Sequence, residues 1–378
     1  MKKIAIIGEF YSTNLGDAAI VDTVKNMVES NGIEAEIFDF GARSNWNFDI
    51  EVKHYHGILK VAKKIIHPLY LNINKTFGLK NQRHRISDYS YFDDINSEEF
   101  GGVIFAGGQL FSDYFVKEII NLVKLFSNRE INISFNSIGI GKISDENIDK
   151  LCKCLKNPKV KYISMRDGSD LLKDRGITVT DSFDSVVSNS FIFSDLSKIN
   201  FAVDSCFKNK IGLGIMKIAT KEDKLLEFWK SLINNIEKLG YEWEIFTNGD
   251  PWDNDFGEQL LKYIGRKDKS VLAPKEWKDL VKIIQSFDKI MSFRMHSHII
   301  AYSYNIPSFA FSWDKKIETF FFKIGHPNRA TEWKRLNFNP EIIESLTYNN
   351  WDDEVRKRQN ELIKKEIKIQ VCKLLYEK

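Results

Sequence analysis

The chain has 378 residues, of which 43% are apolar and 28% charged, and its formal net charge is +3. This composition is typical of a soluble globular protein, and so small a net charge gives no general attraction for nucleic acid. A chain of this length exceeds what one hydrophobic core usually holds, so we expect two domains.

The sequence indicates a cytoplasmic protein. No stretch approaches the roughly 20 apolar residues of a membrane span, and the opening MKKIAIIGEF has too short an apolar run for a signal peptide. The four cysteines form no CxxC pair, so we interpret them as reduced thiols and expect no metal site.

The chain opens with a strand–loop–helix–strand pattern. Ile4–Gly8 is an apolar run typical of a buried parallel strand, and the loop Glu9–Asp17 follows it. Ala18–Glu29 has apolar residues at helical spacing and ends at Asn31-Gly32, and Ile37–Phe40 is a second strand. This order predicts a Rossmann-like unit, although the loop lacks the GxGxxG of a dinucleotide site.

Three further strands end in glycines or in an Arg-Asp pair. They are Gly102–Ala106 before Gly107-Gly108-Gln109, Ile131–Ile138 before Gly139-Ile140-Gly141, and Val160–Ser164 before Met165-Arg166-Asp167. Helices are expected at 114–126, 145–155 and 169–176. Glycines at strand ends let the backbone approach a ligand, and tight turns into a helix need them as well, so both interpretations stay open.

Residues 52–87 differ from the rest of the chain in composition. They contain no Asp or Glu but eight Lys or Arg residues, with apolar residues between them. Such a segment is either the solvated basic face of an insertion or a surface that contacts an anionic membrane.

A second series of strands and helices follows a polar stretch at 191–210, which we expect to be a linker. Strands are expected at 210–216, 241–247, 271–272, 290–293 and 309–311, and helices at 222–239, 256–264 and 275–287. A loop is expected at 248–255, and residues 352–377 form one long charged helix.

The predicted fold is therefore α/β and GT-B-like, with two Rossmann-like domains that face a central cleft and a long C-terminal helix. The expected boundaries are an N-terminal domain at 1–200 with the basic insertion 52–87, a C-terminal domain at 201–350, and the helix at 351–378.

The stretch Met291–Lys316 has the features of an anion site. An apolar strand ends at Phe293, a helical segment runs from Ile299 to Tyr304, and Arg294 and His296 lie between them. Ligands of open α/β sheets bind at this edge, and a guanidinium beside a helix N-terminus suits a small anion.

Four elements together resemble the polysaccharide pyruvyltransferase family. NLGDAAI at 14–20 is similar to its N-x-G-D-x-A-I element, and GGQL at 107–110 to its GGGxL turn, with Gln109 in place of the third glycine. RDGS at 166–169 is similar to its R-[DE]-x-x-S element, one residue tighter before the serine. RMH at 294–296, with Ala301, Pro307 and DKK at 314–316, resembles its R-[LM]-H…A…P…D-x-K block.

The resemblance implies transfer of pyruvate from phosphoenolpyruvate (PEP) to two hydroxyls of a sugar, which leaves a pyruvate ketal. The sugar would belong to a cell-surface polysaccharide or its lipid-linked precursor. The implied partners are PEP and the sugar or lipid-linked acceptor, with no nucleic acid, no cofactor and no metal. The implied location is cytoplasmic, with peripheral contact at the inner membrane face through 52–87 as the open alternative.

The PEP side is expected on the C-terminal domain. Arg294 is a candidate to hold an anionic group bidentately, and His296 to act as general acid. Arg166 is a second candidate cation, with an ion pair to Asp167 or Asp170 as the alternative. Further candidate substrate contacts are Met295, Lys316, Gly16, Gly107 and Gly108.

The acceptor side is expected on the N-terminal domain. Asp17 is a candidate base for a sugar hydroxyl, with helix N-capping as the alternative, and Asn14 is a candidate to orient the sugar. Trp46, Trp252 and Trp313 are candidates to stack on sugar rings or simply to pack. We expect His298 to be structural.

Two other functions fit the same fold. One is a GT-B glycosyltransferase that uses a nucleotide sugar, since it too needs cations for phosphate. The other is a non-catalytic glycan-binding protein, against which the pairing of Arg294 with His296 argues.

Overall fold

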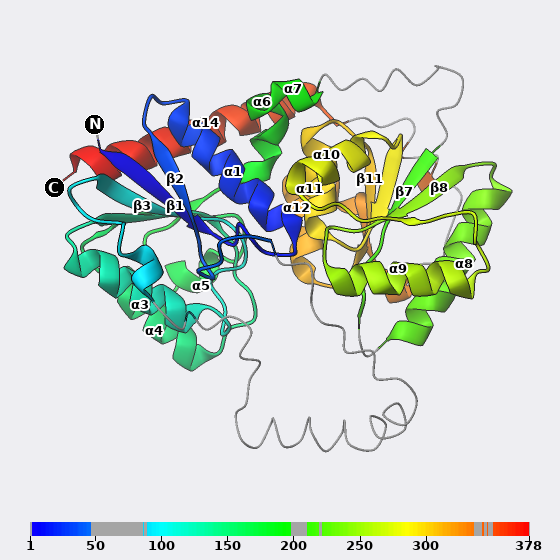
Figure 1. Cartoon of the computed structure of the whole chain (residues 1–378), viewed down its shortest axis with the longest axis horizontal. Helices are drawn as coiled ribbons and strands as arrows, with labels where there is room; N and C mark the ends of the chain where they lie inside the picture. The colour runs from blue at the N-terminus through cyan, green and yellow to red at the C-terminus, as the bar shows by residue number, and fades with distance from the viewer. Residues whose placement is uncertain are drawn as a thin grey trace, which may run out of the picture.

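The computed structural model describes residues 2–46, 86, 89–197, 210–218, 221–335, 342–343, 346 and 351–377. Two parallel six-stranded sheets lie side by side, each with helices on both faces (Figure 1). The expected α/β architecture with two Rossmann-like halves is confirmed.

The N-terminal sheet has the strand order β2-β1-β3-β4-β5-β6. Its strands are β1 (Lys3–Gly8), β2 (Ala35–Asp39), β3 (Phe100–Ala106), β4 (Asn132–Ile138), β5 (Val160–Met165) and β6 (Thr180–Asp181). Ile4 and Ile6 of β1 pack into one core, and Ala5 and Ile7 pack into another. Because alternate residues face opposite sides of a strand, burial on both faces explains the unbroken apolar run.

Helices cover both faces of this sheet. They are α1 (Leu15–Glu29), α3 (Val116–Asn128), α4 (Asp145–Leu155) and α5 (Asp170–Lys173), with a 3-10 turn η1 (Tyr89–Phe92). β1 pairs with β2 on one side and with β3 on the other. The chain therefore leaves β1 and β3 in opposite directions, and such a switch point opens a crevice at the carboxyl ends of the strands.

The C-terminal sheet has the order β12-β11-β10-β7-β8-β9, with its switch point between β7 and β10. Its strands are β7 (Lys210–Gly214), β8 (Glu242–Phe246), β9 (Val271–Leu272), β10 (Lys289–Ser292), β11 (Ser308–Ser312) and β12 (Ala330–Glu332). Its helices are α8 (Glu222–Lys238), α9 (Pro251–Tyr263), α10 (Trp277–Gln285), α11 (Met295–Ser303) and α12 (Lys315–Lys323), with η3 (Pro327–Arg329) and η4 (Trp333–Arg335).

Three helices begin earlier than the sequence predicts, and each earlier start places a side chain of the candidate site in a first helical turn. α9 begins at Pro251 because the carboxylate of Asp250 accepts the backbone N–H of Trp252 at 2.9 Å, so a loop through residue 255 was wrong. α11 begins at Met295 and α1 at Leu15, which puts His296 and Asp17 in first helical turns.

The long C-terminal helix α14 (Asp353–Tyr376) confirms the expected helix and packs on the N-terminal sheet (Figure 1). Gly102 of β3 allows this approach, because a Cβ there would lie 2.7 Å from the Cβ of Leu374. The side-chain amide of Asn132 donates to the carbonyl of Leu374 at 2.9 Å. Among the described residues, no helix is both long and apolar enough to cross a bilayer.

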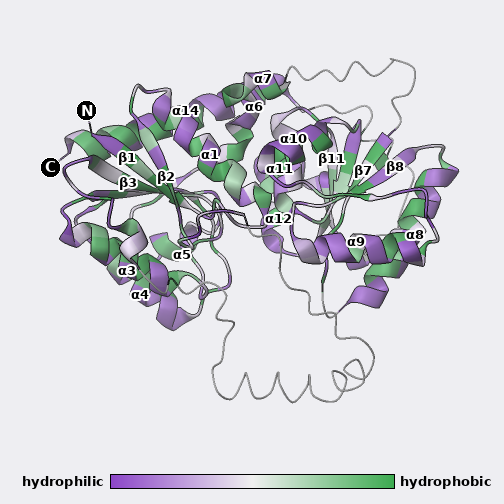
Figure 2. Ribbon diagram, in the orientation of Figure 1, coloured by the Kyte–Doolittle hydropathy of each residue, from purple (hydrophilic) through white to green (hydrophobic). Residues whose placement is uncertain are grey.

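A shared hydrophobic core joins the two halves. It contains Ala18 and Ala19 of α1 together with Trp277 and Leu280 of α10, and Figure 2 shows apolar segments on the helices between the sheets. The indole N–H of Trp277 also donates to a carboxylate oxygen of Asp22 at 3.1 Å. The short connecting elements are η2 (Ser185–Ser188), α6 (Asn189–Ile192) and α7 (Ser194–Ser197), and residues 198–209 of the expected linker lie outside the described chain.

Candidate active site

A cavity of about 210 Å³ lies where the switch points of the two sheets face one another. Its lining comes from both halves: Glu9, Asn14, Asp17, Gly108, Gln109, Leu110, Phe115, Arg166, Asn248, Arg294, Met295, His296, Trp313 and Lys316. Of the candidate catalytic and substrate-binding residues predicted from sequence, the tryptophans apart, Gly16 and Gly107 do not line it and the others do. The expected cleft between two domains is therefore present.

Arg294 occupies the N-cap position of α11 and points toward the first turn of α9. Its Nε donates to Oδ2 of Asp253 at 2.7 Å, and its Nη2 lies 2.5 Å from the same oxygen and 3.4 Å from Oδ2 of Asp250. Burial raises the pKa of Asp253, and the charge of Arg294 opposes that rise. The guanidinium is thus a fixed cation at the cavity wall, with one edge engaged by α9.

His296 lies in the first turn of α11 and is 6% exposed. Gly16 of α1 packs directly against its ring, since a Cβ on Gly16 would lie 2.2 Å from Nδ1. Its Nε2 lies 3.4 Å from Nη1 of Arg166 and 3.8 Å from Oδ2 of Asp184. A guanidinium only donates, so this neighbour assigns the lone pair of the neutral ring to Nε2 and its proton to Nδ1.

Burial lowers the pKa of His296, and the nearby carboxylates of Asp17 and Asp184 oppose that effect only in part. Arg166 and Lys316 lower the pKa of this imidazole further. The ring is therefore neutral at neutral pH.

Arg166 follows β5 and is 5% exposed. Its Nε lies 3.2 Å from Oδ2 of Asp167, which was an expected partner, and its Nη1 pairs with Oδ2 of Asp184. The second partner is thus Asp184, just before η2, and not Asp170. Two carboxylates hold this guanidinium across the cavity from the α9 carboxylates that hold Arg294.

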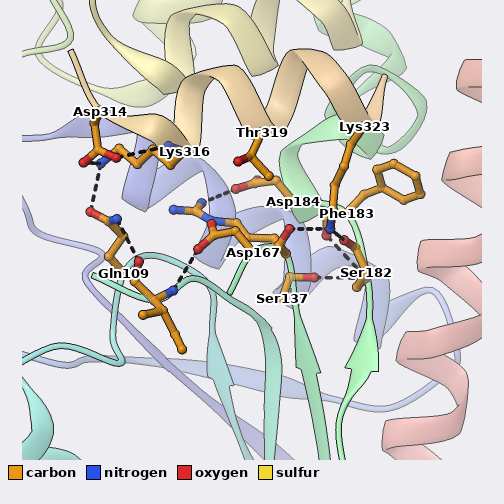
Figure 3. A network of polar contacts seen from close by, with 12 residues as sticks. Gln109, Ser137, Asp167, Ser182, Phe183, Asp184, Asp314, Lys316, Thr319 and Lys323 are labelled. Atoms are coloured by element: carbon orange, nitrogen blue, oxygen red, sulfur yellow. Dashed lines mark hydrogen bonds and ion pairs between the residues drawn. The ribbon is translucent and has the colours of Figure 1, made fainter. Parts of the chain in front are cut away.

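Lys316 and Gln109 connect the two halves. Nζ of Lys316 donates to Oε1 of Gln109 at 2.8 Å, and Nε2 of Gln109 donates to the carbonyl of Ile140 at 3.2 Å. Figure 3 shows Lys316 and Lys323, both on α12, reaching toward the loops of the N-terminal sheet. Nζ of Lys323 donates to the carbonyl of Ser182 at 3.1 Å.

Burial lowers the pKa of Lys316. Its nearest carboxylate among the described residues is that of Asp314, 3.8 Å away, and its hydrogen-bond partner Gln109 is neutral. Lys316 is therefore less neutralised than either arginine, and an anion that enters the cavity would relieve its desolvation.

Asn14 and Asp17 form the wall opposite α11. Asn14 holds the N-cap position of α1, and its amide donates to Oδ2 of Asp17 at 2.8 Å. Asp17 is the third residue of the helix, so the alternative role of Asp17 as the N-cap residue was wrong. Its carboxylate lies beside Gly108, which has a φ of +71° and where a Cβ would lie 3.5 Å from Oδ1. Gly107 instead packs on Ile20, where a Cβ would lie 2.3 Å from Cγ2.

Glu9 is a cavity residue that the motifs did not single out. It follows β1 directly, and its Oε1 lies 2.9 Å from Nη2 of Arg43. Burial raises the pKa of Glu9 to about 7, with Asp17 adding to the effect and Arg43 opposing it. The signal in the sequence is an acidic residue immediately after a buried strand, and only the strand order places that position at a switch point.

Asn248 was also missed, because it falls in what sequence alone predicts to be a loop. Its Oδ1 accepts the hydroxyl of Ser297 at 2.7 Å, and its carbonyl accepts the N–H of Leu15 at 3.0 Å. It therefore ties the first turns of α1 and α11 together at the cavity.

The aromatic candidates differ in position. Trp313 is 43% exposed and lines the cavity, and its indole N–H is fixed by the carbonyl of Phe293 at 2.9 Å. Trp252 is exposed beside Lys217, and Trp46 packs edge-on against Tyr11 at 5.0 Å. Neither of these two lines the cavity.

His298 lies outside the cavity lining and is fully buried. Its Nε2 donates to the carbonyl of Ser292 at 3.0 Å. The described part of the chain contains no cluster of three or more His, Cys, Asp or Glu side chains suited to a metal ion. The basic segment 52–87 lies outside the described residues except for Ile86, which is buried.

Solved structures with the same architecture cover nearly the whole chain. UDP-GlcNAc 2-epimerase from Methanocaldococcus jannaschii superposes with a TM-score of 0.59 at 11% identity, over 98% of this chain and 99% of that one. The epimerase from Rickettsia bellii gives 0.59 at 12% identity, over 100% and 97%. That from Neisseria meningitidis, bound to UDP-GlcNAc, gives 0.56 at 12% identity, over 99% and 100%. At these identities the likeness shows the fold alone, which is GT-B-like.

Among curated proteins, no sequence matches this chain. The model of the polysaccharide pyruvyl transferase family matches residues 14–315. That range starts at the N-cap residue of α1 and ends at the first residue of α12, so it takes in strands β2 to β11 and most of the cavity wall. The chain belongs to the polysaccharide pyruvyl transferase family.

Proposed function

We propose that the protein transfers pyruvate from PEP to two hydroxyls of a sugar in a cell-surface polysaccharide or its lipid-linked precursor, forming a pyruvate ketal. One observation carries the proposal: the cavity places three cations, Arg166, Arg294 and Lys316, around one imidazole. PEP has a carboxylate and a phosphate, and both need cationic or N–H donors.

The two arginines differ from Lys316 in what they offer. Their guanidiniums are already paired with carboxylates, so they orient an anion more than they neutralise it. Lys316 has a neutral hydrogen-bond partner and a lowered pKa caused by burial. We assign the phosphate to Lys316 and the carboxylate to the N–H groups that start α11 and to Arg294.

His296 is the proposed general acid. Its lowered pKa keeps the imidazole neutral before PEP binds. A bound phosphate adds negative charge beside the ring and raises that pKa, so the protonated imidazole forms when PEP is present. The proton then goes to the methylene carbon of PEP, which becomes the methyl group of the ketal.

The protons of the reaction balance without a metal or a redox cofactor. Two sugar hydroxyls lose their protons, one proton ends on the former methylene carbon, and the other leaves with the phosphate. The carbon that carried the phosphate gains two bonds to sugar oxygens. Asp17, held by Asn14, is the proposed base for one hydroxyl.

Acceptor-dependent release of phosphate from PEP tests the function. We expect release with some members of a panel of free and lipid-linked glycosides, and loss of release in His296→Ala. His326→Ala is the matched control, because His326 packs on Trp351 away from the cavity. Release of a nucleoside diphosphate from a nucleotide sugar, with PEP inert, would instead identify a glycosyltransferase.

We also propose a cytoplasmic location, with residues 52–87 in contact with the inner face of the membrane. The support is compositional: eight basic residues and no acidic ones. Flotation with anionic liposomes at low salt tests it, and a full-length protein that stays unbound would reject the membrane contact.

A further inference from the structure

The acceptor side of the cavity presents a second carboxylate. Glu9 leaves the end of β1, while Asp17 lies in the first turn of α1, and both line the same cavity. β1 and α1 are consecutive elements, so the two carboxylates enter from one side, at the switch point between β1 and β3. A ketal uses two hydroxyls, and each must lose a proton.

We propose that Glu9 is a second acid–base residue, which accepts the proton of one acceptor hydroxyl while Asp17 serves the other. This rests on the proposed pyruvyl transfer. In the step assigned to Glu9, the hydroxyl oxygen forms a bond to the carbon that carries the phosphate. The bond from that carbon to the phosphate oxygen breaks, its electron pair leaves with the phosphate, and the hydroxyl proton passes to Glu9.

A partly buried network of charged side chains fixes the position of Glu9. Asp39 at the end of β2 is fully buried and accepts the backbone N–H groups of Tyr11 and Gly41 at 2.8 and 2.9 Å. It also pairs with Arg43, whose Nε lies 2.7 Å from Oδ2, and Arg43 reaches on to Glu9. A side chain that must meet a substrate in a fixed geometry needs hydrogen bonds and ion pairs from neighbouring residues to hold it, whereas an ordinary surface salt bridge does not.

The charges around Glu9 suit a group that exchanges protons near neutrality. Burial raises the pKa of Glu9 to about 7. The charge of Arg43 opposes this rise, and the charges of Asp17 and Asp39 add to it. A base with a pKa near the working pH is ionised often enough to accept a proton and releases it readily. Arg166, Arg294, Lys316 and His296 face it from the other walls of the cavity.

The test is the pH dependence of PEP turnover in the full-length protein. Wild type should lose activity as pH falls through about 7, because Glu9 must be ionised to act. Glu9→Gln should lower kcat by about 100- to 10,000-fold at pH 8, leave the KM for PEP within about twofold, and abolish this acidic limb. Arg43→Gln should shift the limb to higher pH, since the opposing cation is gone.

Glu36→Gln is the matched control, because Glu36 lies on β2 with a half-exposed side chain and should leave rate and limb unchanged. Glu9→Gln with wild-type kcat and an intact acidic limb would overturn the role of Glu9 while leaving pyruvyl transfer standing. A wild-type protein that releases no phosphate from PEP with any acceptor would instead contradict the proposed function, and the role of Glu9 with it. Circular dichroism of Glu9→Gln separates a folding defect from a chemical one.

Discussion

Nη1 of Arg166 lies 3.4 Å from Nε2 of His296, although the two residues are 130 positions apart and belong to different sheets. Asp184 contacts both side chains, through an ion pair with Arg166 and at 3.8 Å from the imidazole. The general acid proposed for the C-terminal half is thus positioned by the N-terminal half. The protonation of His296 depends on charges from both sides of the cavity.

Replacement of Arg166 tests this relationship. Arg166→Met should raise the pKa of His296, because it removes the cation that lies beside Nε2 of the imidazole. It should also lower the free energy of unfolding by about 3–5 kcal/mol, because Asp184 is left buried without its partner. Histidine-ring NMR titration and urea unfolding measure the two effects. Arg166→Lys keeps the charge and should fold more stably than Arg166→Met. An unchanged imidazole pKa would contradict the contact.

Gly16→Ala tests the packing of α1 on the imidazole. Glycine inside a helix normally costs about 1 kcal/mol relative to alanine, so an unobstructed site would gain stability. Here the added Cβ would lie 2.2 Å from the ring of His296. We expect a stability loss and a fall in PEP turnover of roughly 100-fold from the displaced imidazole. The control is Gly176→Ala, which has open space but a φ of +72°, and which should lose stability without a loss of turnover.

Lys316→Met tests the assigned phosphate contact. We expect the affinity for PEP to fall by about 10- to 100-fold, because an ammonium that makes a charged hydrogen bond is lost. Calorimetric titration with PEP measures it. Lys315→Met changes the exposed neighbouring residue and should bind PEP as wild type does. Equal affinities in the two variants would place the phosphate elsewhere.

Glu9 makes the protein less stable as pH rises. The pKa of its carboxyl is about 7 in the folded protein against 4.5 as its ordinary value, so the native state holds the extra proton between these pH values. Stability from this group is therefore present at pH 4.5 and lost by pH 7, to the extent of roughly 3 kcal/mol. Relative to wild type, Glu9→Gln should gain stability as pH rises from 5 to 8. Parallel stability curves for the two proteins would contradict the buried carboxylate.

His298 has the opposite effect on the pH dependence of stability, since it makes the protein less stable as pH falls. Burial lowers its pKa from 6.5 to about 4, so the unfolded chain binds the extra proton between these values. Stability is therefore full above pH 6.5 and falls by roughly 3 kcal/mol as pH drops to 4. His298→Gln can still donate to the carbonyl of Ser292 and should flatten this acid-side loss. Urea unfolding at several pH values measures it, and an acid-side loss as steep as in wild type would contradict the assignment.

The fold could be predicted from the sequence where the local apolar pattern of a segment agrees with its burial in the structure. The apolar run of β1 indicates a strand buried on both faces, and both faces of β1 do meet helices. The path of α14 was not predictable, because it depends on Gly102 in β3 meeting Leu374 near the end of the chain. The start of α9 was missed because Asp-Pro is also a common loop sequence, and here it caps a helix.

The site was predictable where motifs mark it and not where distant segments complete it. Arg294 and His296 stand at a strand end, and both line the cavity. Asp184 and Asp253 are buried carboxylates that fix the two arginines, yet neither lies near its arginine in the sequence. Glu9 required the strand order, which puts the end of β1 at the switch point.

The most direct test follows the methylene carbon of PEP and the solvent proton that this carbon gains during the reaction. Wild-type protein is incubated in deuterium oxide with a glycoside that supports phosphate release and with PEP isotopically labelled at its methylene carbon, and the product is analysed by NMR. We predict a ketal methyl group that carries one solvent deuterium, and no such product with His296→Ala. A wild-type product without a labelled ketal methyl, or equal ketal formation by His296→Ala, would contradict the central claim that this cavity transfers pyruvate with His296 as the acid.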